Sequence, residues 1–262
     1  MDTPTKLEDI KEILILGAGT LGLRIGLQAA ISGFDVIIYD ISNEVFEKAQ
    51  GIQAGILKGL LKADKISEDE IEAVKQRISW TTDLEVACDN PDLVSESVPE
   101  DLDIKKKVWK KVGELCPEGT IFTTNTSYML SSWMAEETGR PAQFCAFHFH
   151  DVFFANVVDI MPHAHTASWL PPLLEALGKK LNQIPVHIEK ESQGYIFNAM
   201  LMSLLGAAGH LVTAGVASPE DVDKSWMGNF KMDMGPFGIM DSIGLDTAWH
   251  VTKDRKDDRS KR

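Results

Sequence analysis

The stretch EILILGAGTLG, residues 12–22, decides the fold class. Its first half, Glu12–Leu16, has the continuous apolar character of a strand that is buried on both faces. Its second half is a GxGxxG motif, and a helical pattern follows at once over Leu21–Ile31. A strand, a glycine turn and a helix in direct succession are typical of a dinucleotide-binding βαβ unit.

Each glycine of the motif has a separate task. Gly17 permits a tight turn, Gly19 lets the backbone approach a pyrophosphate, and Gly22 lets the helix pack close to the strand. The helix N-terminus, at Thr20 and Leu21, offers free N–H groups and the positive end of the helix dipole. The motif therefore predicts a binding site for the phosphates of a dinucleotide.

The second strand, Asp35–Tyr39, ends at Asp40, and this spacing from the glycines suits a carboxylate that contacts the adenosine ribose. A carboxylate favours a free 2′-hydroxyl and repels a 2′-phosphate, so the cofactor is expected to be NAD rather than NADP. FAD, and a glycine turn without any ligand, are the weaker alternatives. FAD would require more chain for its isoalloxazine ring.

The rest of the chain predicts an α/β fold, a Rossmann-type doubly wound parallel sheet with a smaller all-α C-terminal domain. We expect an NAD-binding domain over residues 1–190, with a helical hairpin near 43–78, and a helical substrate or dimerisation domain over 191–262. Further strands are expected at 92–96, 120–124, 143–149, 156–161 and 184–188. Helices are expected at 43–62, from a cap at Ser67, and at 102–115, 131–137, 166–181, 194–214, 219–228 and 237–251, followed by a frayed tail from Lys253.

Bulk composition narrows the function classes. The formal net charge of -13 argues against a nucleic-acid binder, which would usually be basic. No apolar run is long enough for a membrane span, and the charged N-terminus lacks a signal-peptide pattern. Three scattered cysteines predict neither a disulfide framework nor a zinc cluster. We therefore expect a soluble cytoplasmic protein that acts on a small molecule.

The chemistry is expected at the carboxyl ends of the strands. Oxidation of an alcohol by NAD needs a base for the hydroxyl proton, and a histidine whose tautomer is fixed by a carboxylate suits that task. His148 and Asp159 could form such a pair if their strands are neighbours. His150 lies two residues from His148, a spacing that can bind metal, but no cysteine or glutamate cluster supports it. No metal is therefore expected.

Six motifs together make the chain similar to the 3-hydroxyacyl-CoA dehydrogenase family, whose relatives include 3-hydroxybutyryl-CoA dehydrogenases and the lambda-crystallin (L-gulonate 3-dehydrogenase) branch. They are LGAGTLG at 16–22, SESVPEDLDIKKKV at 95–108, TTNTS at 123–127, the His148 strand with VVDIMPH at 157–163, QGYIFN at 193–198 and GPFGIMDSIGLD at 235–246. The resemblance implies a Rossmann domain, a helical dimer-forming domain and a role in fatty acid or butanoate metabolism.

The resemblance also implies roles for single residues. His148 and Asp159 match the family's acid/base pair, Ser127 matches a serine that binds the substrate's 3-oxygen, and Asn198 matches an active-site asparagine. Residues near the cofactor are matched by Glu100, Lys105 and Asn125. The chain departs from the family where HFFNP is replaced by HFHDV, where the acid is Asp rather than Glu, and where its spacing from the histidine is one residue shorter.

Three functions stay open on this basis. The first is a 3-hydroxyacyl-CoA dehydrogenase, with an acyl-CoA thioester as substrate. The second, motivated by the altered segment after His148, is a dehydrogenase of a free 3-hydroxy acid or sugar acid. The third is a non-catalytic NAD-binding protein. The apolar segment Gly194–Ala214 predicts a homodimer interface, with burial inside the monomer as the alternative.

Overall fold

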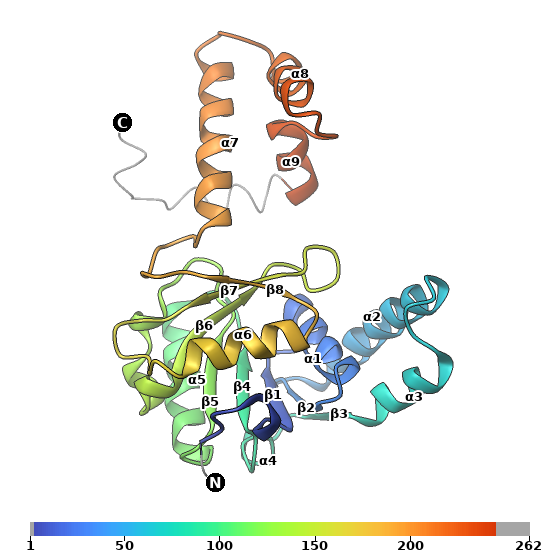
Figure 1. Cartoon of the computed structure of the whole chain (residues 1–262), viewed down its shortest axis with the longest axis vertical. Coiled ribbons are helices and arrows are strands. Elements are labelled where there is room, and N and C mark those ends of the chain that lie inside the picture. Colours follow the sequence, from blue (N-terminus) through green and yellow to red (C-terminus); the bar gives the residue numbers. More distant parts are fainter. Residues whose placement is uncertain (1–2, 245–262) are drawn as a thin grey trace. The chain divides into compact units, whose positions relative to one another are not determined.

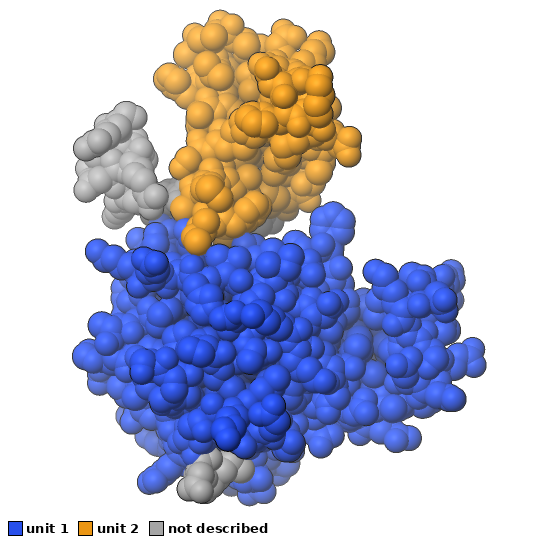
Figure 2. Space-filling view, in the orientation of Figure 1, with its two compact units in different colours: residues 1–195 blue, residues 196–262 orange. Residues whose placement is uncertain are grey.

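The computed structural model describes residues 3–244. It divides the chain after Tyr195 into two compact units, which are coloured separately in Figure 2. The first unit carries the whole sheet, and the second is helical.

The first unit is built on one eight-stranded sheet with the strand order β3-β2-β1-β4-β5-β6-β7-β8. Every neighbouring pair is parallel except β6 and β7, which are antiparallel. The strands are β1 (Glu12–Leu16), β2 (Asp35–Tyr39), β3 (Ile78–Thr81), β4 (Leu93–Glu96), β5 (Ile121–Thr124), β6 (Phe144–Phe149), β7 (Val157–Met161) and β8 (Ile184–His187). The expected doubly wound fold is confirmed.

Helices cover both faces of the sheet, as Figure 1 shows. Alternation along β1 sends Ile13 and Ile15 into one core with buried residues of α1 and α6, and Leu14 and Leu16 into a second core with α5. The helices of this unit are α1 (Thr20–Ile31), α2 (Asn43–Lys62), α3 (Glu68–Gln76), α4 (Leu84–Ala87), α5 (Leu102–Leu115) and α6 (Leu170–Lys180). A strand that is apolar on both faces is therefore buried on both faces.

The antiparallel pair β6–β7 is the main departure from an all-parallel sheet. The connection between the two strands, residues 150–156, contains no helix, and a crossover to a parallel strand needs a longer connection. The chain therefore turns back on itself. This turn places His148 directly opposite Asp159 in the strand register.

Local signals located most elements of the first unit. Ser67 caps α3 with the expected capping box, in which its hydroxyl accepts from the N–H of Glu70. The helix expected over 131–137 is wrong, because two 3₁₀ turns, Ser131–Trp133 and Glu136–Thr138, occupy that segment. The helix expected from 166 begins only at Leu170, where two prolines fill the first turn, which tolerates them. Strand β3 was not expected, because its ISWT sequence is short and only half-buried.

The second unit contains three described helices, α7 (Phe197–Thr213), α8 (Pro219–Phe230) and α9 (Pro236–Ile243). The side chain of Asp223 accepts from the N–H groups of Phe237 and Gly238, so a residue of α8 caps the start of α9. The expected helix over 237–251 and the tail from Lys253 extend beyond the described residues. Among the residues that are described, no helix is long and apolar enough to cross a membrane.

Candidate active site

The glycine turn lies between β1 and α1, where each glycine is explained by its surroundings. Gly17 has φ +99°, and a Cβ there would lie 2.7 Å from the carbonyl oxygen of Ser97. A Cβ on Gly22 would lie 1.9 Å from the carbonyl oxygen of Gly17. A Cβ on Gly19 would meet no atom within 4 Å, so this side of the turn is open. Gly17 and Gly22 are therefore required because a side chain would collide with the backbone, whereas Gly19 leaves room for a ligand.

Asp40 is tied to this turn. One carboxylate oxygen accepts from the N–H of Ala18 at 2.8 Å, and the other accepts from the N–H of Ser42 at 3.3 Å. These contacts hold the carboxylate at the carboxyl end of β2, beside the N-terminus of α1 that begins at Thr20. The open turn, the free helix N-terminus and a fixed acid fit the adenosine half of NAD.

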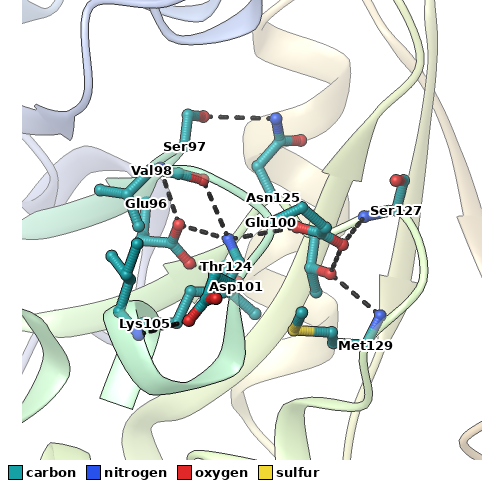
Figure 3. Close-up of polar contacts among 12 residues, drawn as sticks. Glu96, Ser97, Val98, Glu100, Asp101, Lys105, Thr124, Asn125, Ser127 and Met129 are labelled. Carbon is teal, nitrogen blue, oxygen red and sulfur yellow. Dashed lines mark hydrogen bonds and ion pairs between the residues drawn. The ribbon is translucent and has the colours of Figure 1, made fainter. Parts of the chain in front are cut away.

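A buried ion pair lies under the neighbouring loop (Figure 3). The ammonium of Lys105, only 1% exposed, lies 2.6 Å from one carboxylate oxygen of Glu96, which also accepts from the N–H of Val98. The other oxygen of Glu96 accepts from the hydroxyl of Thr124 at 2.6 Å. Glu100 lies 3.4 Å from the same ammonium. The positive charge of Lys105 is thus compensated by the carboxylates of Glu96 and Glu100.

Glu100 connects this network to the loop that follows β5. Its carboxylate accepts from the hydroxyl of Thr126 and from the N–H of Ser127, the latter at 3.2 Å. Ser127 itself is exposed on that loop. Figure 3 shows these residues gathered from the ends of two adjacent strands, β4 and β5. Glu100 therefore fixes the backbone from which Ser127 projects.

Asn125, which follows β5, bridges the loop after β4 and the end of β6. Its side-chain amide donates to the hydroxyl of Ser97 at 3.3 Å, and its side-chain oxygen accepts from the N–H of Phe149 at 2.8 Å. Phe149 directly follows His148 at the end of β6. Asn125 thus spans from the loop beside the glycine turn to the histidine strand.

His148 and Asp159 face each other across β6 and β7. Nδ1 of His148 lies 3.1 Å from Oδ2 of Asp159, and the two residues are 4% and 1% exposed. The same carboxylate oxygen lies 2.9 Å from Nε2 of His150, which is less buried than His148. One carboxylate therefore serves two imidazole rings.

The surroundings set the protonation of this group. Burial lowers the pKa of His148, and the nearby His150 lowers it further, although the hydrogen bond to Asp159 acts in the opposite direction. Burial raises the pKa of Asp159, but the hydrogen bonds with both imidazoles outweigh burial, so its pKa is lowered overall. At neutral pH the group therefore consists of a carboxylate and a neutral His148, and a ring that donates from Nδ1 keeps a lone pair on Nε2.

Tyr195 covers the ring of His148, with the two ring centroids 4.8 Å apart. Its side chain is buried, and its hydroxyl has no hydrogen-bond partner among the described residues. Burial raises the pKa of this phenol well above its ordinary value. Tyr195 could not be recognised as a site residue from the sequence, since the contact depends on how the segment after β8 folds back.

The segment that departs from the family motif is anchored to α1. The carboxylate of Asp151 forms an ion pair with Arg24 and also accepts from the N–H groups of Phe153 and Phe154. The next residue, Val152, has φ +91°. Asn198 belongs to the second unit, where it lies in the first turn of α7, and its role beside His148 stays a prediction.

Family models match both parts of the chain. Residues 12–192 match the NAD binding domain of 3-hydroxyacyl-CoA dehydrogenase, and residues 194–262 match the C-terminal domain of the same family. Among curated proteins, the chain is 34% identical to a probable 3-hydroxybutyryl-CoA dehydrogenase from Deinococcus radiodurans, over 89% of this chain and 84% of the relative. It is 30% identical to the mitochondrial hydroxyacyl-coenzyme A dehydrogenase of Sus scrofa, over 92% and 80%.

Solved structures agree with these matches. An (S)-3-hydroxybutyryl-CoA dehydrogenase from Ralstonia eutropha superposes with a TM-score of 0.88 at 30% identity, covering 94% of this chain and 86% of that chain. A diketoreductase, described as catalysing reactions of dicarbonyl compounds, superposes with a TM-score of 0.89 at 34% identity, covering 94% and 88%.

Proposed function

The chain belongs to the 3-hydroxyacyl-CoA dehydrogenase family, and from this premise we propose that it interconverts a 3-hydroxyacyl-CoA and a 3-oxoacyl-CoA, with NAD as its cofactor. The observation that carries the proposal is the buried pair of His148 and Asp159, which lies at the same end of the sheet as the glycine turn after β1. NAD, when bound, supplies the acceptor for the hydride of the alcohol carbon.

The glycine turn and Asp40 hold the cofactor in this proposal. The N–H groups at Gly19, Thr20 and Leu21 would hold the pyrophosphate, because the dipole of α1 favours negative charge at its N-terminus. The carboxylate of Asp40, which the N–H of Ala18 holds in place, would accept hydrogen bonds from the ribose hydroxyls and disfavour a 2′-phosphate.

His148 is the general base in the direction of alcohol oxidation. Nε2 takes the hydroxyl proton, and the carboxylate of Asp159 stabilises the positive ring that results. In the reverse direction the same nitrogen returns the proton. Burial excludes water from this pair, so that the carboxylate interacts strongly with the developing charge.

Ser127 and Asn198 are assigned to the substrate's 3-oxygen, as donors that balance its developing negative charge. Glu100 acts through Ser127 by fixing its backbone. Asn125 holds the His148 strand against the nicotinamide side of the sheet. We assign Lys105 to the buried pair with Glu96 rather than to a cofactor contact.

A second candidate is a dehydrogenase of a free hydroxy acid or another small carbonyl compound without CoA. The similarity to a diketoreductase, a name that refers to dicarbonyl compounds, favours this alternative. The altered and separately anchored segment around Asp151 gives it a structural basis, because this segment follows the base directly.

Homodimerisation through the second unit is the proposed assembly. Only Leu205 and Ala208 of α7 are buried within the described chain, whereas Met200 is 61% exposed. A helix with so much apolar surface needs a partner. Sedimentation of the wild type and of Met200→Glu tests this: a dimer that the charge dissociates is expected, and a wild-type monomer at micromolar concentration would rule it out.

The compartment that we propose is the cytoplasm, with a small molecule as the partner. The three cysteines, Cys88, Cys116 and Cys145, are buried free thiols, which suits a reducing environment.

Initial rates of NADH oxidation with acetoacetyl-CoA and with acetoacetate test the substrate class. The main proposal expects kcat/KM for the thioester to exceed that for the free acid by about 100-fold or more, equivalent to about 2.7 kcal/mol of binding energy. Equal values would favour the second candidate. Binding of NADH without turnover of either compound would overturn both in favour of a non-catalytic protein.

A further inference from the structure

The base proposed above belongs to a larger cluster of three ligand-type side chains, namely His148, His150 and Asp159. One ligand atom from each residue lies within 4.8 Å of the other two. From the sequence alone, only the spacing of the two histidines was evident, and this spacing does not suffice to predict a metal site. The antiparallel strand β7 adds the carboxylate from across the sheet.

The distances within the cluster suit a small ion. Zinc bonds to nitrogen or oxygen of about 2.0–2.2 Å place the ligands of a tetrahedral site about 3.3 Å apart. Nδ1 of His148 and Nε2 of His150 lie 3.1 and 2.9 Å from Oδ2 of Asp159. For an ion to replace the two hydrogen bonds, these two separations would widen by a few tenths of an ångström. The two imidazole nitrogens, which lie within 4.8 Å of each other, would settle at about 3.3 Å.

The donor types select the kind of ion. Two imidazoles and one carboxylate are ligands that zinc and similar transition metals accept, with one position left open. Magnesium and calcium prefer a full set of oxygen ligands, so the cluster disfavours them. The carboxylate of Asp159 offsets one of the two positive charges, and Glu100 is the next acid whose charge acts on His148. His150, the least buried of the three, leaves a side from which an ion can enter.

We propose that His148, His150 and Asp159 bind one divalent transition-metal ion, with zinc as the best fit, and that this ion inhibits the dehydrogenase. The ion takes the lone pair of Nδ1 of His148, so the single proton of the neutral ring moves to Nε2. Nε2 then carries a proton and cannot accept another from the substrate. The inhibition rests on the proposed function, whereas the binding does not.

Calorimetric titration of the chelator-treated full chain with zinc tests the binding. One ion per chain is expected, with a dissociation constant in the micromolar range or below, and magnesium is expected not to bind. His150→Gln should weaken zinc binding by about 100-fold or more, since even the loss of an outer-shell partner weakens metal sites by about 10–100-fold. Retained NADH binding shows that the variant is folded.

The matched control is His187→Gln. His187 also contacts a carboxylate, with Nε2 2.8 Å from Glu175, but this pair is exposed and is not part of any three-ligand group within residues 3–244. Zinc binding should survive its loss. Zinc that binds equally to wild type and His150→Gln, or not at all, would overturn the proposal. So would a loss of binding in His187→Gln.

Two further readouts separate binding from catalysis. Cobalt in place of zinc should give the visible absorption of a four-coordinate ion in the wild type, and no such band would count against the site. Zinc should stop the reduction of NAD by 3-hydroxybutyryl-CoA reversibly, with activity restored by chelator, because this is the direction in which Nε2 of His148 must accept a proton. If the chelated enzyme has no activity at all, the proposed function fails while the calorimetric result still decides the metal site.

Discussion

Replacing Asp159 with asparagine removes the negative charge beside His148 and keeps nearly the same shape. Nδ1 of His148 and Oδ2 of Asp159 are 3.1 Å apart. Unit charges at this distance interact by about 5 kcal/mol at an effective dielectric constant of about 20. If about half of the positive charge has developed on the ring in the transition state, the loss is about 2.7 kcal/mol.

A loss of this size lowers kcat by about 100-fold, because each 1.36 kcal/mol corresponds to about tenfold in rate. The asparagine amide can also donate to Nδ1, which would place the ring proton on Nε2. A wrong tautomer of this kind costs up to about 10,000-fold in a serine protease triad. We therefore expect Asp159→Asn to lower kcat by about 100-fold to 10,000-fold.

The pH profile separates this effect from a simple change in protonation. Burial already lowers the pKa of His148, and Asp159 raises it only in part, so its loss moves the pKa further down. The ring then stays neutral at pH 7 in both proteins, and raising the pH should not restore the rate.

NADH formation from NAD and saturating 3-hydroxybutyryl-CoA, followed from about pH 5 to 9, provides the assay, because the neutral ring is the active form in this direction. The comparison variant is His150→Gln, which leaves the contact between Asp159 and His148 intact and should cost less than about tenfold. A loss below tenfold in Asp159→Asn, or recovery at high pH, would show that the charge of Asp159 does not assist proton transfer by His148.

Four other predictions, the first with a control variant, concern separate parts of the chain. Lys105→Met leaves the buried carboxylate of Glu96 without its cation and should lower the free energy of unfolding by about 3–5 kcal/mol in urea titrations. The control Lys106→Met removes a partly exposed ion pair and should change this free energy by less than about 1 kcal/mol. Similar losses in the two variants would contradict the importance of the buried pair. Gly22→Ala places a Cβ 1.9 Å from a backbone oxygen, so NADH binding should be lost, and normal binding would show that the turn can move. Asp40→Asn should lower the preference for NAD over NADP by about tenfold or more in kcat/KM, and an unchanged ratio would assign selectivity elsewhere. Tyr195→Phe removes a buried hydroxyl without a partner among the described residues and should raise the free energy of unfolding by about 1 kcal/mol, while destabilisation would mean that the hydroxyl is satisfied.

Features that depend on near neighbours in the chain could be predicted from the sequence. The strand, turn and helix around Gly17 and the end of α2 at Lys62 were predicted in this way. In each case the residues that determine the structure lie within a few positions of it. The same holds for the Ser67 capping box. These local rules suffice for the Rossmann fold and for the cofactor turn.

Features that depend on distant segments could not be predicted. The position of Asp159 opposite His148 was conditional on strand order, and the second imidazole on the same oxygen needs the register of the antiparallel pair. The burial of Lys105 depends on the packing of α5 beneath β4, since a lysine in the sequence KKK has the pattern of a solvated helix face. The segment between β6 and β7 did carry one usable signal, a connection too short for a parallel crossover.

His148→Gln, assayed with acetoacetyl-CoA and NADH, tests the assignment of the acid/base residue. We predict that NADH oxidation falls by about 100-fold or more while NADH binding is retained, since a general acid or base contributes about 10²–10⁴-fold. Equal rates in the wild type and the variant would overturn the assignment, because the proton would then be supplied to the substrate by a group other than His148.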